Sequence, residues 1–189
     1  KKILILGGSG FVGMNLCSYF AKKNYNIVST YFKNKPKKKK NVKYIKFNLM
    51  SDKFDKIIFN KIDTIFVCSA NSSGAKVMTN NPASHFEDNV KMNLNLAKNL
   101  KYSNVRKIVF FSSSTVYPDT TKSCAEKDIN YTFFEKYNFI GNGKLMIEKI
   151  YQLYATEMKK KIDLLIIRPS NLYGPYDKFD KEKSKVIPS

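Results

Sequence analysis

The sequence contains no tryptophan, one histidine and three cysteines among its 189 residues. Cys17, Cys68 and Cys124 lie far apart and form no CxxC pair, so they indicate neither a zinc site nor a disulfide framework, and no metal site is predicted. Because disulfides are rare in reducing compartments, this cysteine usage fits a cytoplasmic protein. The single histidine, His85, follows Pro82 and is interpreted as a residue of a helix start without a chemical role.

Long hydrophobic runs are also lacking. No stretch approaches the roughly 18 to 20 apolar residues that a membrane-spanning helix needs, so no membrane partner is predicted. The first apolar run, residues 3–6, ends at a pair of glycines. It is short for the core of a signal peptide and indicates a buried first strand instead.

Arginine is scarce in a chain whose formal charge is +19. Only Arg106 and Arg168 are arginines among the 34 basic residues; lysine supplies the rest, and asparagine is abundant. Because arginine makes the bidentate contacts that read phosphates and bases, this composition is typical of AT-rich codon usage rather than of a nucleic-acid-binding surface. Binding of nucleic acid stays a minor alternative that net charge alone supports.

The apolar residues, 43 % of the chain, fall into short buried runs that alternate with amphipathic stretches. The expected elements are strands at residues 3–6, 26–31, 42–47, 62–68, 105–111 and 162–167, and helices at 11–20, 86–100 and 141–158. In the first helix, Tyr19 is expected on the buried face beside Phe20. Strands separated by helices predict an α/β fold with a doubly wound parallel sheet flanked by helices.

Three glycines connect the first expected strand to the first expected helix. Gly7, Gly10 and Gly13 lie in the sequence GGSGFVG, where glycine permits a tight turn and a close approach of the backbone to a pyrophosphate. The N-terminus of the helix would then face the phosphates with unpaired N–H groups. This order of strand, turn and helix predicts dinucleotide binding.

The end of the second expected strand bears on the choice of dinucleotide. An acidic residue there usually binds the ribose hydroxyls of NAD, but this chain has Thr30 and Tyr31, followed by Lys33. The lack of a carboxylate and the nearby cation favour NADP, with NAD left open. Lys33 could equally belong only to the solvated lysine-rich run of residues 33–40.

Together, these motifs resemble the extended short-chain dehydrogenase/reductase family, the NAD(P)-dependent epimerases, dehydratases and reductases of nucleotide sugars. The resemblance rests on GGSGFVG, on SSSTVYP at residues 112–118 and on RPSNLYGP at residues 168–175. Within the family, residues 69–74, 80–82 and 171–188 are most similar to the GDP-L-fucose synthase group. The resemblance implies a Rossmann domain at residues 1–170 and the start of a substrate-binding region at 171–189, with the rest of that region largely absent from this chain.

The resemblance also implies roles for individual residues. Ser113, with Ser114 as the alternative, would polarise the reacting sugar oxygen, and Lys144 would bind the nicotinamide ribose. The residues implied to bind the cofactor are Gly7, Gly10, Phe11, Val12, Gly13, Thr30, Lys33, Asn48, Leu49, Cys68, Ser69, Ala70, Asn89, Lys144, Pro169 and Asn171. The residues implied to contact the sugar are Ser72, Ser73, Ser113, Asn171 and Lys185.

Three positions depart from the pattern of the family. A tyrosine one helical turn before Lys144 would exchange the proton, but that position is Ile140, which carries none. Thr115, water or a displaced tyrosine such as Tyr137 would have to supply it. In the GDP-L-fucose synthase group a cysteine and a histidine perform the epimerisation, and the matching positions here are Thr115 and Lys185. The double epimerisation is therefore not expected.

The combined prediction is an NAD(P)-dependent reductase or epimerase that transfers hydride at C4 of a nucleotide-activated sugar in surface polysaccharide synthesis. The alternative, motivated by Ile140, is a dinucleotide-binding protein that has lost catalysis and serves as a sensor or as a subunit of a complex. The resemblance further implies a homodimer that pairs through the two long expected helices, residues 86–100 and 141–158.

Overall fold

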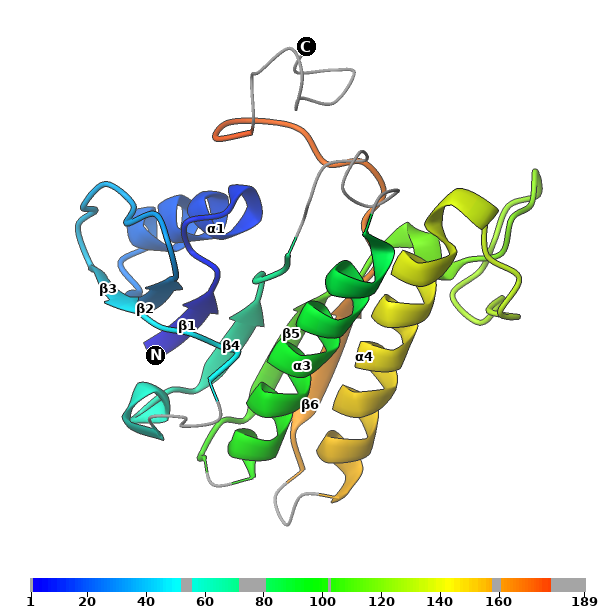
Figure 1. The fold of residues 1–189 in the computed structure, drawn as a ribbon. Coiled ribbons are helices and arrows are strands. Elements are labelled where there is room, and N and C mark those ends of the chain that lie inside the picture. The colour runs from blue at the N-terminus through cyan, green and yellow to red at the C-terminus, as the bar shows by residue number, and fades with distance from the viewer. Residues whose placement is uncertain (1, 52–55, 72–80, 102, 158–160, 178–189) are drawn as a thin grey trace.

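The computed structural model describes residues 2–51, 56–71, 81–101, 103–157 and 161–177. Within this part of the chain, six parallel strands form one sheet in the order β3-β2-β1-β4-β5-β6 (Figure 1). The strands are β1 (Lys2–Leu6), β2 (Asn26–Tyr31), β3 (Val42–Lys46), β4 (Thr64–Val67), β5 (Lys107–Phe111) and β6 (Asp163–Ile167). The helices are α1 (Phe11–Lys22), α3 (Pro82–Leu100) and α4 (Asn138–Glu157), and short 3-10 turns are η1 (Lys56–Phe59), η2 (Ser114–Val116) and η3 (Glu135–Tyr137).

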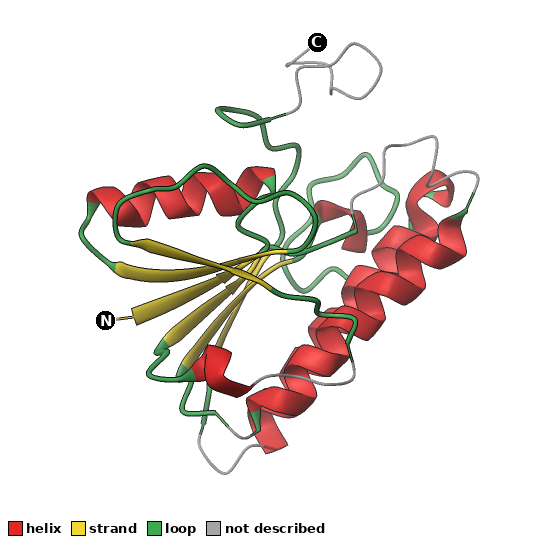
Figure 2. Cartoon of the chain, turned by 60° about the vertical axis from the view of Figure 1, so that its left-hand side comes forward, coloured by secondary structure: helices red, strands yellow, loops and turns green. Residues whose placement is uncertain are grey.

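The sheet is covered on both faces. Figure 2 shows α1 over one face, and α3 and α4 side by side over the other. The strand order reverses at β1, because β2 and β3 continue to one side of it and β4, β5 and β6 to the other. In doubly wound sheets, ligands bind beyond the carboxyl ends of the strands at this reversal. The segments that follow β1, β4 and β5 therefore mark where a site is expected.

The central strand β1 contributes to two cores at once. Ile3 and Ile5 pack on the side of α1, whereas Leu4 and Leu6 pack on the side of α3 and α4. Successive side chains of a strand point to opposite faces of the sheet, so both sets are buried only when helices cover both faces. This arrangement explains why the first strand is apolar at every position from Ile3 to Leu6.

The predicted doubly wound sheet is confirmed, and every expected strand is present with slightly shifted ends. α4 begins at Asn138 rather than at Gly141, because the preceding turn η3 leads directly into it. Ile140 consequently lies in the first turn of α4. Among the described residues, none of the helices combines the length and the apolar character needed to cross a membrane.

The prediction that Tyr19 is buried is wrong. Its side chain is 55 % exposed, because the buried face of α1 follows Gly13 and Cys17, and Tyr19, two residues after Cys17, lies about 200° around the helix from it and points away from the core. The ring packs edge-on against Phe20, and the Lys23 amine lies 5.5 Å from its centroid.

Candidate functional site

The turn after β1 is built so tightly that two of its glycines cannot be replaced without displacement of the backbone. Gly7 has a φ of +84°, and a Cβ added there would lie 2.7 Å from the amide nitrogen of Ser69. A Cβ on Gly13 would lie 2.2 Å from the carbonyl oxygen of Gly7. These contacts bring the start of α1 against the turn and bring the turn against the segment that follows β4. The result is a narrow backbone cradle at the carboxyl edge of the sheet.

The N-terminus of α1 opens onto this cradle. Gly10 is the residue that caps the helix, it provides no side-chain hydrogen bond, and the first turn contains no acidic residue. The first N–H groups of a helix have no partner within the helix, and the helix dipole adds positive potential there. The Gly10 N–H donates to the Gly7 carbonyl at 3.0 Å, so the N–H groups of Phe11 and Val12 give this end of α1 the character of a phosphate site. This cradle fits a dinucleotide pyrophosphate.

Thr30 connects the end of β2 to the same turn. Its Oγ1 accepts a hydrogen bond of 3.1 Å from the Gly7 N–H, and its carbonyl accepts one of 2.7 Å from the Gly8 N–H. Lys33 lies exposed in the loop that follows β2. Residues 29–35 contain no carboxylate, so the local charge beyond β2 is positive.

The segments after β3 and β4 place four further predicted cofactor residues at or near this edge. The backbone of Cys68 and Ser69 is the surface that a Cβ on Gly7 would strike, and burial raises the pKa of the Cys68 thiol. Ala70 is exposed. After β3, Asn48 Oδ1 accepts a hydrogen bond of 3.0 Å from the Met50 N–H.

Leu49, beside Asn48, lies in the core instead of at the surface. It is 7 % exposed and belongs to the cluster on the side of α3 and α4. Its carbonyl accepts a hydrogen bond of 3.2 Å from the Asn95 side chain of α3. Leu49 therefore faces the interior with its side chain, and only its backbone is available to a ligand.

The serine run, residues 112–114, follows β5 at the carboxyl edge of the sheet, on the side of β1 away from β2. Ser113 adopts an extended conformation, and its Oγ accepts a hydrogen bond of 3.2 Å from the Thr115 N–H at the start of η2. The Ser114 N–H donates to the Pro169 carbonyl at 3.0 Å, which joins this run to the segment after β6. Thr115 Oγ1 is buried and has no hydrogen-bond partner among the described residues.

Lys144 projects from α4 toward the end of β5. Its Nζ donates a hydrogen bond of 2.9 Å to the carbonyl of Phe111 and lies 5.1 Å from the centroid of the Phe110 ring. Burial lowers the pKa of Lys144 from its usual value of 10.5 to about 8, while Glu148 and Cys68 act in the opposite direction. The amine is therefore held at the end of β5, directly before the serine run that starts at Ser112, and it loses its proton more readily than an exposed lysine does.

A buried polar network fixes the helix that carries Lys144. Glu148, one turn further along α4, accepts a hydrogen bond of 2.5 Å from Ser112 Oγ. Its two oxygens also accept from the Nε and Nη2 of Arg168, and Arg168 Nη1 lies 3.3 Å from the Tyr117 hydroxyl. The hydrogen bond to Glu148 raises the pKa of Arg168, so the guanidinium is permanently charged. This network ties α4 to the ends of β5 and β6.

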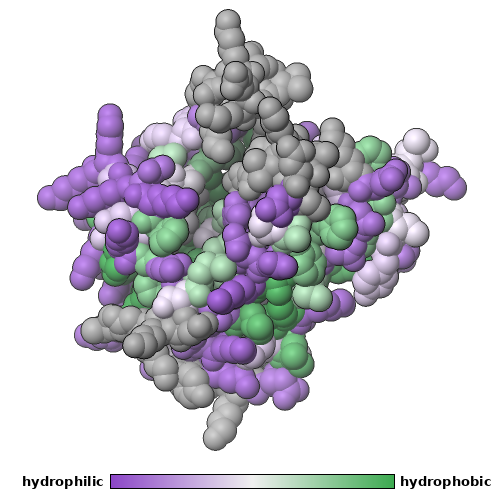
Figure 3. Space-filling model, in the orientation of Figure 1, coloured by the Kyte–Doolittle hydropathy of each residue, from purple (hydrophilic) through white to green (hydrophobic). Residues whose placement is uncertain are grey.

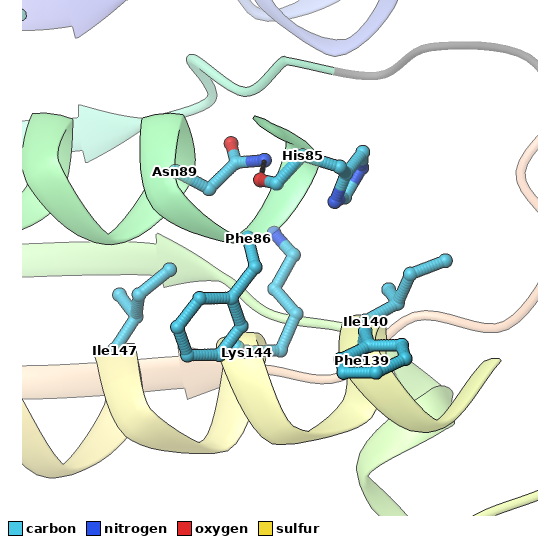
Figure 4. Close-up of a pocket in the computed structure, with 8 residues that line it drawn as sticks. His85, Phe86, Asn89, Phe139, Ile140, Lys144 and Ile147 are labelled. Carbon is cyan, nitrogen blue, oxygen red and sulfur yellow. Dashed lines mark hydrogen bonds between the residues drawn. The ribbon is translucent and has the colours of Figure 1, made fainter. Parts of the chain in front are cut away.

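A hollow lies between α3 and α4 at the same edge (Figure 4). Gly143 permits the close approach of the two helices, since a Cβ there would lie 3.1 Å from the Phe86 ring. The hollow is lined by His85, Phe86 and Asn89 of α3 and by Phe139, Ile140, Gly143, Lys144 and Ile147 of α4. The position expected for a tyrosine, Ile140, thus faces the same space as Lys144 and His85.

His85 is the residue of this hollow that sequence reasoning missed. The expectation that it begins a helix is confirmed, because α3 starts at Pro82. The sequence did not indicate that it shares the hollow with the Lys144 amine. No local pattern could have shown this, because the two helices are far apart in the sequence.

Asn89 uses its side chain to hold the segment after β4. Its Oδ1 accepts a hydrogen bond of 2.9 Å from the Asn71 N–H, and its Nδ2 donates to the Asn71 carbonyl at 3.1 Å. Asn171 is exposed after β6. The predicted sugar contacts Ser72, Ser73 and Lys185 lie outside the described residues. Within the described ranges, no group of three His, Cys, Asp or Glu residues could hold a metal ion.

The chain is similar in sequence to a family of nucleotide-dependent enzymes and to individual members of known activity. The model of a family described as the NAD dependent epimerase/dehydratase family matches residues 3–189. GDP-L-colitose synthase of Yersinia pseudotuberculosis is 28 % identical over 192 residues, a match that spans 100 % of this chain and 58 % of that protein. GDP-L-fucose synthase of Escherichia coli K12 is 28 % identical over 131 residues, 68 % of this chain and 40 % of that protein.

The fold has close counterparts among solved structures. UDP-glucose 4-epimerase of Thermotoga maritima, solved with UDP-glucose, superposes with a TM-score of 0.84 at 20 % sequence identity. The match covers 100 % of this chain and 61 % of that structure. At this identity the likeness shows the fold. The chain spans about 60 % of the length of the first relatives that it matches.

Proposed function

We propose that this chain, which belongs to the NAD dependent epimerase/dehydratase family, provides the dinucleotide-binding and reacting part of a nucleotide-sugar reductase or epimerase. The chemistry is hydride transfer at C4 of a nucleotide-activated 4-keto-6-deoxy sugar, of the kind used to build surface polysaccharides. The observation that carries the proposal is that the glycine cradle, Ser113 and Lys144 meet at one carboxyl edge of the sheet.

A nicotinamide dinucleotide supplies the hydride when it is bound. The N–H groups of Phe11 and Val12 would hold its pyrophosphate, because they lie in the first turn of α1 without a partner inside the helix, while the Gly10 N–H donates to the Gly7 carbonyl at 3.0 Å and shapes the turn. Lys144 would hold the nicotinamide ribose from the other side, next to the end of β5. NADP is favoured over NAD because residues 29–35 lack a carboxylate and contain Lys33.

The chain's own polar groups would act on the sugar. Ser113, placed by its hydrogen bond from the Thr115 N–H, would donate a hydrogen bond to the reacting oxygen. Lys144, with a pKa lowered to about 8, would keep positive charge beside that oxygen at neutral pH. Thr115 Oγ1, which is buried without a described partner, is a further hydroxyl near the serine run.

A second candidate function is binding of the dinucleotide without catalysis, in a sensor or a subunit of a complex. The observation that favours it is that Ile140 faces the hollow where a phenol would carry the proton. The two functions share the glycine cradle and differ in turnover, so cofactor binding and turnover have to be measured separately.

A homodimer that pairs through α3 and α4 belongs to the same proposal. Phe139, Met146 and Leu153 are 59 %, 47 % and 57 % exposed and recur at steps of seven residues along α4. Such spacing keeps them close to one face of the helix. Figure 3 shows apolar surface over the region of α3 and α4. Exposed apolar area of this kind is typical of a protein contact.

The test uses the chain as it is. NADPH and NADH are titrated against it by fluorescence of the reduced nicotinamide, and turnover of GDP- and dTDP-4-keto-6-deoxy sugars is followed by loss of its absorbance. Lys33→Ala is expected to weaken NADPH binding about tenfold and to leave NADH unchanged, while Lys35→Ala in the same loop is the matched control. Failure to bind either dinucleotide would overturn both candidate functions, and binding without turnover of any of these sugars would leave only the second.

A further inference from the structure

The hollow between α3 and α4 contains one titratable side chain, His85, for which the family resemblance implies no role. His85 lines this hollow together with Ile140 and Lys144, and in Figure 4 the Lys144 amine points from α4 toward the first turn of α3, which carries His85. His85 is the only histidine of the chain. A phenol is missing from the position of Ile140, so a group able to exchange a proton is needed in the same space.

The topology places His85 at the reacting edge. α3 follows β4 in a parallel sheet, so its first turn lies at the carboxyl ends of the strands, where ligands bind. His85 lies in that first turn, and Ile140 lies in the first turn of α4. Lys144, whose amine reaches the end of β5, lies one turn further along α4. The imidazole is therefore at the same end of the fold as Ser113.

The imidazole is also available to a ligand. The His85 carbonyl accepts a hydrogen bond of 2.6 Å from Asn89, but within the described residues no hydrogen bond engages the ring nitrogens. The charged groups that face the ring are Lys144 from α4 and Asp88 from α3, and Asp88 accepts a hydrogen bond from the Asn71 side chain. Burial and the Lys144 charge lower the pKa of His85, and Asp88 opposes them.

We propose that His85 is the proton-transfer group of this site and replaces the phenol that residue 140 does not supply. The inference rests on the proposed function. In the direction of reduction, the imidazolium of His85 donates its proton to the sugar oxygen while the carbonyl carbon accepts hydride from the reduced dinucleotide. The carbonyl π electrons move to the oxygen, an alcohol and the oxidised dinucleotide result, and the neutral imidazole regains a proton from water.

This assignment fixes the direction of the pH dependence. Reduction needs the protonated imidazole, so kcat should fall as pH rises through the lowered pKa of His85, below its usual 6.5. A reaction in which Lys144 supplied the proton would instead hold its rate up to about pH 8. The two donors are therefore separated by the pH profile alone.

A single histidine makes a measurement without turnover possible. The imidazole proton resonances of His85 are titrated by NMR in the wild type, in Lys144→Met and in Lys98→Met, a control at the far end of α3. The expected result is a pKa below 6.5 in the wild type and in the control, a higher pKa in Lys144→Met, and a shift of the resonance when NADPH is added. A resonance that responds neither to the Lys144 substitution nor to NADPH would overturn the proposal.

Turnover of GDP- and dTDP-4-keto-6-deoxy sugars with NADPH completes the test. His85→Ala is expected to lower kcat at least about 100-fold with an unchanged dissociation constant for NADPH, and Glu87→Gln on the same helix is the control. The double variant His85→Ala, Ile140→Tyr should regain turnover, which also shows that the fold is intact. Wild-type protein that binds NADPH but has no turnover, or a His85→Ala variant that keeps wild-type turnover, overturns the role of His85. Loss of NADPH binding by the wild type overturns the proposed function itself.

Discussion

Glu148 of α4 and Arg168, which directly follows β6, form a forked ion pair. Arg168 Nε donates to one carboxylate oxygen at 3.0 Å and Nη2 donates to the other at 2.8 Å. The side chain of Glu148 is 1 % exposed and that of Arg168 is 16 % exposed. Ser112 shares the carboxylate, so this pair joins the helix that carries Lys144 to two strand ends of the candidate site.

We expect Glu148→Gln to lower the free energy of unfolding by about 3 kcal/mol, because removal of one partner leaves the other charge buried without compensation. Urea denaturation measures the loss. The control is Asp63→Asn, which removes an ion pair with Arg106, whose side chain is 73 % exposed. An exposed pair contributes less than about 1 kcal/mol, so equal losses in the two variants would contradict the structural role of Glu148.

We expect Gly13→Ala to abolish measurable binding of NADPH and to reduce stability by about 1–3 kcal/mol. The added methyl group would meet the Gly7 carbonyl oxygen at 2.2 Å, so α1 has to move away from the turn that it closes. Binding is measured by nicotinamide fluorescence and stability by thermal unfolding. Lys22→Ala at the exposed end of α1 should change neither, and unaltered binding by Gly13→Ala would show that the cradle does not hold the cofactor.

The parts of the fold that sequence reasoning predicted are those with local signals. The apolar run of β1, the glycine turn and α1 follow one another directly in the sequence. This order of strand, glycine turn and helix is enough to predict the cradle. The hollow between α3 and α4 has no such signal. His85 and Lys144 come from two helices that are distant in the sequence and pack closely where Gly143 faces the Phe86 ring. Contacts of this kind depend on helix packing, which periodicity does not specify.

The stability effect of Lys144 is expected to depend on pH with a defined sign. Its pKa is about 8 in the folded chain and about 10.4 in an unfolded one, so the unfolded state binds more protons between these values and stability gains with rising pH there. Relative to Lys144→Met, the wild type should therefore gain about 2–3 kcal/mol between pH 7 and pH 10. Guanidinium denaturation at both pH values tests this. Lys149→Met, an exposed position on α4, should show no such difference, and a pH-independent offset for Lys144→Met would contradict the lowered pKa.

Leu153→Glu is expected to convert the proposed homodimer into monomers, because a carboxylate placed in an apolar contact has to be desolvated without a partner. Leu153 is 57 % exposed, so the substitution should leave the stability of the fold nearly unchanged. Sedimentation velocity at several protein concentrations measures the oligomeric state. Lys22→Glu on α1, which covers the other face of the sheet, controls for the change of charge. A wild type that is monomeric at every concentration would refute the dimer.

Ile140→Tyr is expected to raise turnover of 4-keto-6-deoxy sugars by at least about tenfold, because it places a phenol one helical turn before Lys144 in the hollow that both side chains line. The Lys144 charge stabilises the phenolate and so lowers the pKa of the new tyrosine, which brings proton transfer closer to neutral pH. Ile140→Phe is the matched control, since it adds the ring without the hydroxyl. If both variants gained equally, the hydroxyl would have no part in the reaction. If neither variant gained turnover while NADPH still bound, proton transfer would not limit the reaction. The isoleucine at position 140 would then not be the cause of low activity.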